Sequence, residues 1–136
     1  MALLEEALYT RLAAFAGLAA LVTSGSITRI YPVRVPQNAV YPLVSYNRVS
    51  GQRIYAFGIA TGLVVTRMQV SSWDKSYSGV KAVAEQVRLA LSNYAGVSAG
   101  VTIDDISMIS DIDLYEEDTK IFQVAGDFSI DYRETP

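Results

Sequence analysis

The chain of 136 residues contains no cysteine and no histidine. Without cysteine there are no disulfides or thiol nucleophiles, and without either residue the common zinc sites cannot be built. The lack of histidine removes the usual proton carrier near neutral pH, together with Ser-His-Asp and Cys-His catalytic systems. Catalysis would have to rely on carboxylates, lysine or tyrosine, so we expect a protein that is not an enzyme and binds no metal or cofactor.

The sequence also lacks an uncharged apolar run of the roughly 18 residues that a membrane span requires. Its most apolar stretch, residues 12–22, is short, and Glu5 and Glu6 stand where a secretory signal has basic residues. Hydrophobic residues make up 51% of the chain and charged residues 18%, which is typical of a globular domain. We expect a single domain over residues 1–136, made in the cytoplasm and without membrane contact.

Charge is scarce and unevenly distributed. The formal net charge of −3 argues against sequence-specific binding of nucleic acid. Residues 11–103 carry nine basic side chains and two acidic ones, whereas residues 104–136 carry ten acidic side chains and two basic ones. This asymmetry predicts contacts between a basic and an acidic surface, either within one molecule or between neighbouring copies.

Two segments show the three- or four-residue spacing of apolar side chains that indicates a helix packed on one face. We expect these helices over residues 2–21 and 77–93, with Asp74 or Ser76 capping the second. The apolar positions are Leu4, Leu8, Leu12 and Phe15 in the first segment and Val80, Val83, Val87, Leu91 and Tyr94 in the second.

Strand patterns occupy residues 27–31, 43–49, 63–72, 106–114 and 122–132. The resulting order, α-β-β-β-α-β-β, predicts an α+β domain of two layers. In it, a mixed or antiparallel β-sheet is covered on one face by two α-helices.

Details of the strands follow from local patterns. Three of the four prolines lie in residues 30–51 and predict a stiff extended connection before the second strand. A change in the alternation predicts a bulge near Asp104 and Asp105, and it places Ile112 and Leu114 on the same face as Ile106.

Residues 50–62 separate the second and third strands, and we expect them to form a long hairpin loop. Tyr55 and Phe57 make this segment unusually apolar. It either folds back on its own core or contacts a partner. Residues 132–136 are expected to form a short C-terminal tail.

Five acidic residues crowd the hairpin between the last two strands: Asp111, Asp113, Glu116, Glu117 and Asp118. Paired carboxylates can bind a divalent cation, but the Asp-x-Asp-x-Asp-Gly loop of calcium sites is missing. We therefore interpret the cluster as a solvated turn that discourages edge-to-edge aggregation. A carboxylate-based hydrolase would need metal-dependent activity that is lost on substitution of Asp111 or Asp113.

Several segments, taken in order, resemble the tail-completion proteins of long-tailed bacteriophages, which include tail terminators and tail-to-head joining proteins. Residues 30–32 read IYP, and residues 41–51 read YPLVSYNRVSG. The strand at residues 62–73, GLVVTRMQVSSW, and the helix at residues 82–91, AVAEQVRLAL, also match the family pattern. The closing hairpin is similar as well, with DLY at 113–115, DT at 118–119 and AGDFSI at 125–130.

The resemblance implies a structural virion protein that forms a ring, commonly a hexamer. Such a ring caps the head-proximal end of the tail tube, stops its polymerisation and offers a surface to the head connector. DNA passing through the ring would be compatible with this role. The partners implied are other copies of the chain, the tail tube protein and the connector protein. An alternative is a small-molecule or peptide-binding α+β module without catalytic activity.

A ring of identical subunits joins two different patches of each subunit head to tail. We expect one patch to be basic, around Arg34, Arg48 and Arg53, beside the apolar Tyr55 and Phe57. The other patch is the acidic hairpin of the neighbouring copy, formed by Asp111, Asp113, Glu116, Glu117 and Asp118.

Overall fold

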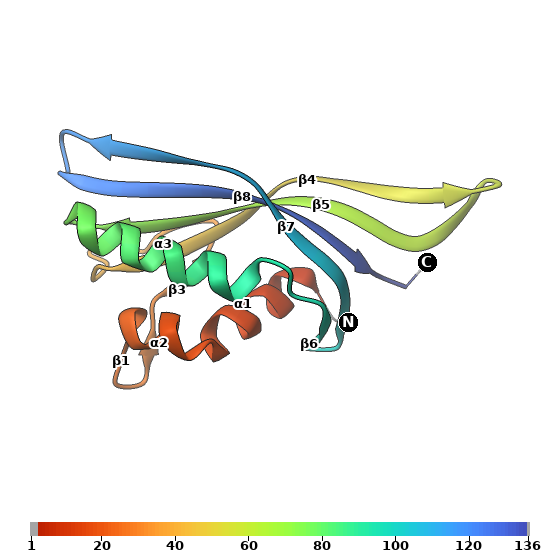
Figure 1. Cartoon of the computed structure of the whole chain (residues 1–136), viewed down its shortest axis with the longest axis horizontal. Coiled ribbons are helices and arrows are strands. Elements are labelled where there is room, and N and C mark those ends of the chain that lie inside the picture. The colour runs from red at the N-terminus through yellow and green to blue at the C-terminus, as the bar shows by residue number, and fades with distance from the viewer. Residues whose placement is uncertain (1–2, 136) are drawn as a thin grey trace.

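The structure, a computed structural model, describes residues 3–135. Three helices lie against one face of a long, curled β-sheet (Figure 1). The helices are α1 (Leu4–Ala14), α2 (Ala16–Val22) and α3 (Tyr77–Leu91). The strands are β1 (Thr23–Ser24), β2 (Ile27–Thr28), β3 (Ile30–Pro32), β4 (Leu43–Ala56), β5 (Ile59–Asp74), β6 (Gly96–Ser98), β7 (Val101–Glu116) and β8 (Ile121–Arg133). The α+β class is the one that the sequence predicts.

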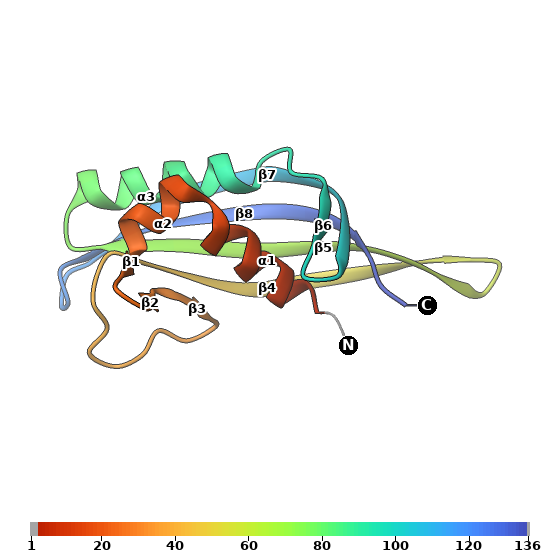
Figure 2. The ribbon, with the colours of Figure 1, turned by 90° about the horizontal axis from the view of Figure 1, so that it is seen from below.

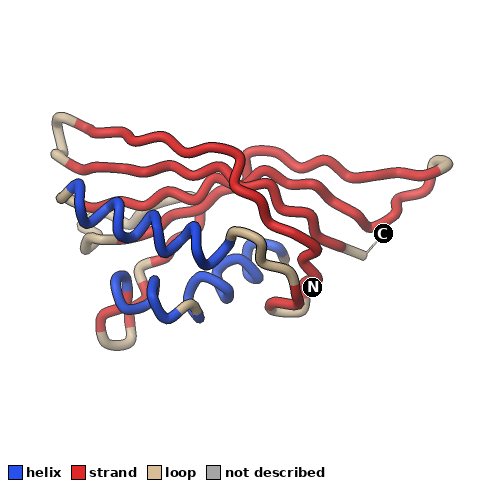
Figure 3. Tube along the Cα trace, in the orientation of Figure 1, coloured by secondary structure: helices blue, strands red, loops and turns tan. Residues whose placement is uncertain are grey.

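The main sheet has six strands in the order β3-β4-β5-β8-β7-β6. Only the β3–β4 pair is parallel among the described residues, so the sheet is mixed, as one of the two expected arrangements has it. Among the four long strands β4, β5, β8 and β7, each is antiparallel to its neighbour in the sheet. They form two hairpins that point to opposite ends of the sheet (Figures 1 and 3).

The core lies between the helices and the inner face of the sheet. Phe128 and Ile130 of β8 and Met68 of β5 are fully buried there, against the apolar stripes of α1 and α3. The stripes are Leu4, Leu8 and Leu12 in α1 and Val80, Val83, Val87 and Leu91 in α3. The apolar spacing of both helices thus predicts their buried faces correctly.

The first helix differs from its prediction because it is broken. Phe15 has an extended backbone, with φ −77° and ψ 111°, and it ends α1 and precedes α2. Helix α2 packs against α3, and at Gly17 the amide end of the Gln86 side chain lies where a Cβ would stand, 2.0 Å away from it. The packing of α2 against α3 therefore favours a change of direction that helical periodicity alone does not indicate. Ala2, included in the predicted helix, lies outside the described residues.

The prediction of a long loop at residues 50–62 is wrong. β4 and β5 continue through this segment as a paired ladder, and only Phe57 and Gly58 form the turn (Figure 2). Both turn residues have positive φ, 52° and 77°, as in the type I′ turn that suits the twist of a two-stranded ribbon. The C-terminal tail is likewise shorter than expected, because β8 extends to Arg133.

The bulge expected near Asp104 and Asp105 is confirmed by a register shift between Ile103 and Asp105. A second shift between Met108 and Ser110 reverses the alternation once more. Ile112 and Leu114 consequently leave the buried face that the sequence predicts for them and are 55% and 45% exposed. Asp111 and Asp113 take the side of the sheet that carries the helices.

Candidate protein-interaction surfaces

The hairpin of β4 and β5 extends well beyond the helices and beyond the end of β8 (Figures 1 and 2). The pairing of β5 with β8 ends at Leu63 and Arg133, so residues 54–62, named here the β4–β5 arm, have only each other as strand partners. Within the arm, Thr61 Oγ1 donates a 2.7 Å hydrogen bond to the Ile54 carbonyl. The arm is thus an ordered ribbon with both faces open.

The arm is apolar and exposed at the same time. Every residue from 49 to 59 is exposed, and residues 54–62 carry no charge. Phe57 at the tip is fully exposed, and its φ of 52° lies in the left-handed region that costs a non-glycine residue roughly 1–2 kcal/mol. A bulky side chain kept in a strained and solvated position gains nothing from monomer packing. This combination points to a contact surface.

The opposite end of the sheet is acidic. Here the β7–β8 hairpin turns beside the start of α3, and every residue from 111 to 120, named here the acidic end, is exposed. Glu116 is the last residue of β7, and residues 117–120 form the turn, which contains Glu117, Asp118 and the basic Lys120. Apolar side chains accompany the carboxylates, since Ile112, Leu114 and Tyr115 are exposed in the same stretch.

Asp113 is the member of the acidic end that binds within its own molecule. Its Oδ2 accepts a 2.9 Å hydrogen bond from the Tyr77 hydroxyl, and its carboxylate lies 3.4 Å from Lys81 Nζ. Hydrogen bonding to Asp113 raises the pKa of both Tyr77 and Lys81. Asp113 thus fixes the acidic end to the first turns of α3 and is less free for a partner than Glu116, Glu117 and Asp118.

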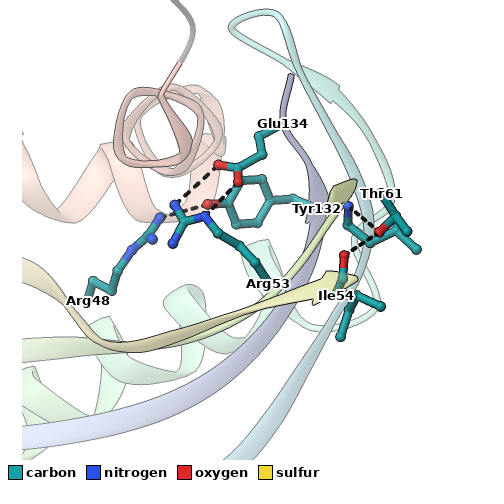
Figure 4. Close-up of polar contacts among 7 residues, drawn as sticks. Arg48, Arg53, Ile54, Thr61, Tyr132 and Glu134 are labelled. Carbon is teal, nitrogen blue, oxygen red and sulfur yellow. Dashed lines mark hydrogen bonds and ion pairs between the residues drawn. The ribbon is translucent and has the colours of Figure 1, made fainter. Parts of the chain in front are cut away.

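A groove of about 810 Å³ lies near the base of the β4–β5 arm, between the start of α1, the β6–β7 turn and the end of β8. Arg48 and Arg53 reach into it from β4, and Tyr132 and Glu134 come from the C-terminal end of the chain (Figure 4). Arg48 Nη2 donates a 2.8 Å hydrogen bond to the Tyr132 hydroxyl, and Arg48 Nε lies 3.4 Å from Glu5 Oε1.

Arg53 forms a two-point contact with Glu134. Its Nε donates to Oε1 at 2.7 Å and its Nη2 donates to Oε2 at 3.3 Å (Figure 4). This hydrogen bond and the charge of Glu134 raise the pKa of Arg53. The planar guanidinium matches a carboxylate at both oxygens, which gives such pairs their geometric specificity.

The three arginines of the predicted basic patch do not form one cluster. Arg48 and Arg53 share the groove, whereas Arg34 lies in the exposed connection between β3 and β4. Within residues 3–135, Arg34 forms no ion pair. Several of the predicted contacts between basic and acidic regions are made inside one molecule, as Arg53–Glu134, Arg67–Asp127 and Lys81–Asp113 show.

Sequence reasoning missed Glu134, Tyr132 and Glu5 as groove residues and the exposed Ile112 and Leu114 at the acidic end. Arg53 and Glu134 are 81 positions apart, so no local pattern joins them. For Ile112 and Leu114 a signal exists, because alternation with Asp111 and Asp113 leaves open which set faces the helices.

In the part of the chain that the structure describes, no group of three or more acidic residues is arranged to hold a metal ion. None of the helices in residues 3–135 combines the length and the apolar character of a membrane span. The β4–β5 and β7–β8 hairpins, at opposite ends of the sheet, both carry exposed apolar side chains, and a charged groove lies near the base of the β4–β5 arm. Exposed apolar surface of this extent is typical of proteins that assemble with other proteins.

Comparison with known proteins identifies the family of this chain. The model of the family described as Tail completion protein gp17 matches residues 6–133. The chain therefore belongs to this family and is a structural protein of phage tail assembly.

Solved structures support the fold. Seventeen chains of solved structures match, and they include a chain from the virion of a native gene transfer agent (GTA) particle. It superimposes with a TM-score of 0.79 at 21% identity, over 98% of this chain and 96% of that one. Among curated proteins there is no match.

Proposed function

We propose that this protein forms a ring that caps the head-proximal end of a tail tube, ends tube polymerisation and provides the surface to which the head connector binds. Membership of the tail completion family is the observation that carries the proposal. The ring is a head-to-tail oligomer, with six subunits as its expected number, and it becomes part of the virion.

The positions of the two hairpins support head-to-tail contact. The β4–β5 arm and the acidic end project from opposite ends of one sheet, so they do not meet within one molecule (Figure 1). A closed ring needs two different, complementary patches on every subunit. Here one end offers the apolar arm, with Arg53 at its base, and the other offers carboxylates with Ile112 and Leu114.

The experiment is a mass measurement by light scattering after size exclusion, first on the protein alone and then with purified tail tubes. We expect a closed oligomer, or a monomer that becomes a ring on tubes. A monomer that ignores tubes would contradict the proposal.

A double variant tests the role of the acidic end. Glu117→Gln with Asp118→Asn removes two negative charges from exposed positions without touching Asp113. We expect weaker ring formation with an unchanged melting temperature. The matched control, Asp105→Asn with Asp131→Asn, removes the same charge from cross-strand partners outside the acidic end and should assemble like the parent chain. Equal assembly of both double variants would contradict a contact through residues 117 and 118.

A further inference from the structure

The Arg53–Glu134 pair joins a residue in the middle of the sheet's pairing to one just after the last strand. Arg53 belongs to β4, which is paired with β5 along its length. Glu134 follows the last residue of β8, and its backbone is held by a 2.8 Å hydrogen bond from its N–H to the Gly62 carbonyl. The two side chains are 48% and 32% exposed. Solvent screens an exposed pair of this kind and leaves it weak, so another carboxylate can replace Glu134 at little cost.

The acidic end supplies carboxylates without partners of their own. Within residues 3–135, none of Glu116, Glu117 and Asp118 forms an ion pair, and all three are exposed. They lie at the end of the sheet opposite the groove (Figure 1). A neighbouring copy, and not the same molecule, is therefore the source from which these carboxylates can reach Arg53.

We propose that Arg53 is the docking point for the acidic turn, residues 116–118, of a second copy, and that Glu134 occupies this point in the free subunit. On association the carboxylate of the neighbour replaces Glu134 on the guanidinium. This inference rests on the proposed head-to-tail ring. It adds that Glu134 competes with the carboxylates of the neighbouring copy for Arg53.

The exchange keeps one arginine–carboxylate pair per subunit, so it adds little net free energy to assembly. Its contribution is to register and reversibility, since the bidentate geometry accepts a carboxylate in one orientation. The apolar surfaces of the β4–β5 arm and of the acidic end supply the remaining attraction.

Removal of the competitor tests the inference. With Glu134→Gln, we expect half-maximal self-association at a protein concentration about 2- to 5-fold lower than for the parent chain, which corresponds to loss of an exposed pair. Arg53→Gln should cancel this gain, so the Glu134→Gln, Arg53→Gln double variant should associate like the parent chain. The matched control is Glu85→Gln, which breaks the exposed Arg88–Glu85 pair of α3, outside the groove, and leaves Arg53 untouched. It should associate like the parent chain.

A peptide readout does not depend on ring formation. A fluorescent peptide with the sequence of residues 111–120 should bind the Glu134→Gln variant more tightly than the parent chain, by fluorescence anisotropy. This gain should disappear with Arg53→Gln and with a peptide in which Glu116, Glu117 and Asp118 are replaced by their amides.

The outcomes separate the two proposals. If the parent chain forms rings but Glu134→Gln changes neither assembly nor peptide binding, the exchange is overturned and the ring remains. If no variant associates, alone or on tubes, while the peptide binds as described, the docking point remains and the ring is overturned. Failure of both readouts overturns both proposals.

Discussion

Arg29 Nε donates a 2.8 Å hydrogen bond to the carbonyl of Pro42, and the arginine is only 6% exposed. Its other nitrogens donate to Ser24 Oγ at 2.7 Å and to the Leu21 carbonyl at 3.2 Å. One buried guanidinium therefore joins the end of α2, the β1–β2 hairpin and the connection that leads into β4.

Replacement of Arg29 by methionine should destabilise the protein by about 3 kcal/mol, because it leaves two carbonyls without a donor in a buried site. The measurement is urea unfolding followed by circular dichroism. Arg34→Gln, at an exposed position, is the control and should change the free energy of unfolding by less than about 0.5 kcal/mol. Equal effects of both substitutions would refute a structural role specific to Arg29.

Two phenylalanines offer a second comparison. Phe128 is 1% exposed in the core, and its replacement by alanine should cost about 3–5 kcal/mol of stability. Phe57→Ala at the tip of the β4–β5 arm should leave the melting temperature of the monomer nearly unchanged but weaken assembly. Thermal unfolding and light scattering on the same samples separate the two effects. A large loss of stability with Phe57→Ala would mean that the arm packs on its own subunit.

The strained turn at Phe57 gives a further prediction. Asparagine tolerates positive φ better than phenylalanine, so Phe57→Asn should preserve or raise the stability of the monomer, by up to about 1 kcal/mol. The same substitution should weaken assembly because it removes the apolar tip. Urea unfolding of the monomer and light scattering provide the two numbers, and a gain in both would argue against a contact through Phe57.

The start of α3 should respond to loss of its cap. Ser76 Oγ accepts a 3.0 Å hydrogen bond from the Gly79 N–H, which confirms one of the two caps considered from the sequence. Ser76→Ala should cost about 1 kcal/mol, whereas Ser76→Asp should retain most of the stability. Chemical unfolding distinguishes the two variants, and an equal loss in both would exclude the capping bond as the cause.

Tyr46 should make stability sensitive to alkaline pH. Burial and the nearby Glu5 raise the pKa of Tyr46 above its ordinary value of 10.0. Because the folded state favours the neutral phenol, the contribution of this group is fully present below pH 10 and is lost as the pH rises through the higher pKa of the folded state. Between pH 9 and about 12, the free energy of unfolding should therefore fall less steeply for Tyr46→Phe than for the parent chain.

Sequence patterns predicted those elements whose evidence is local. The stripe from Leu4 to Leu12, the cap at Ser76 and the bulge beside Asp104 each depend on a few neighbouring residues, and the structure contains all three. Pairing with β5 decides the rest of β4. Gly51, inside the segment expected to form a loop, lies within the ladder, next to a register shift between Arg48 and Ser50.

The interaction surfaces were predicted less completely, for a related reason. The sequence did not indicate the type I′ turn, because phenylalanine is not a residue that this turn favours. The second bulge in β7, between Met108 and Ser110, carries no glycine or proline to mark it, yet it decides which side chains of the acidic end face the helices. The Arg53–Glu134 pair depends on the tertiary fold alone.

Because the two hairpins point in opposite directions, the two ends of the subunit carry different surfaces. In a two-fold dimer the β4–β5 arm of each copy would meet the acidic end of the other, and no end would be left free for growth. Each copy added head to tail presents the same free end again, and growth stops only when the last copy meets the first. In the proposed ring the number of copies depends on the angle between neighbours, and the bulges in β4 and β7 bend the strands that lead to the two contact surfaces. We therefore expect a substitution at a bulge to alter the number of subunits in the proposed ring.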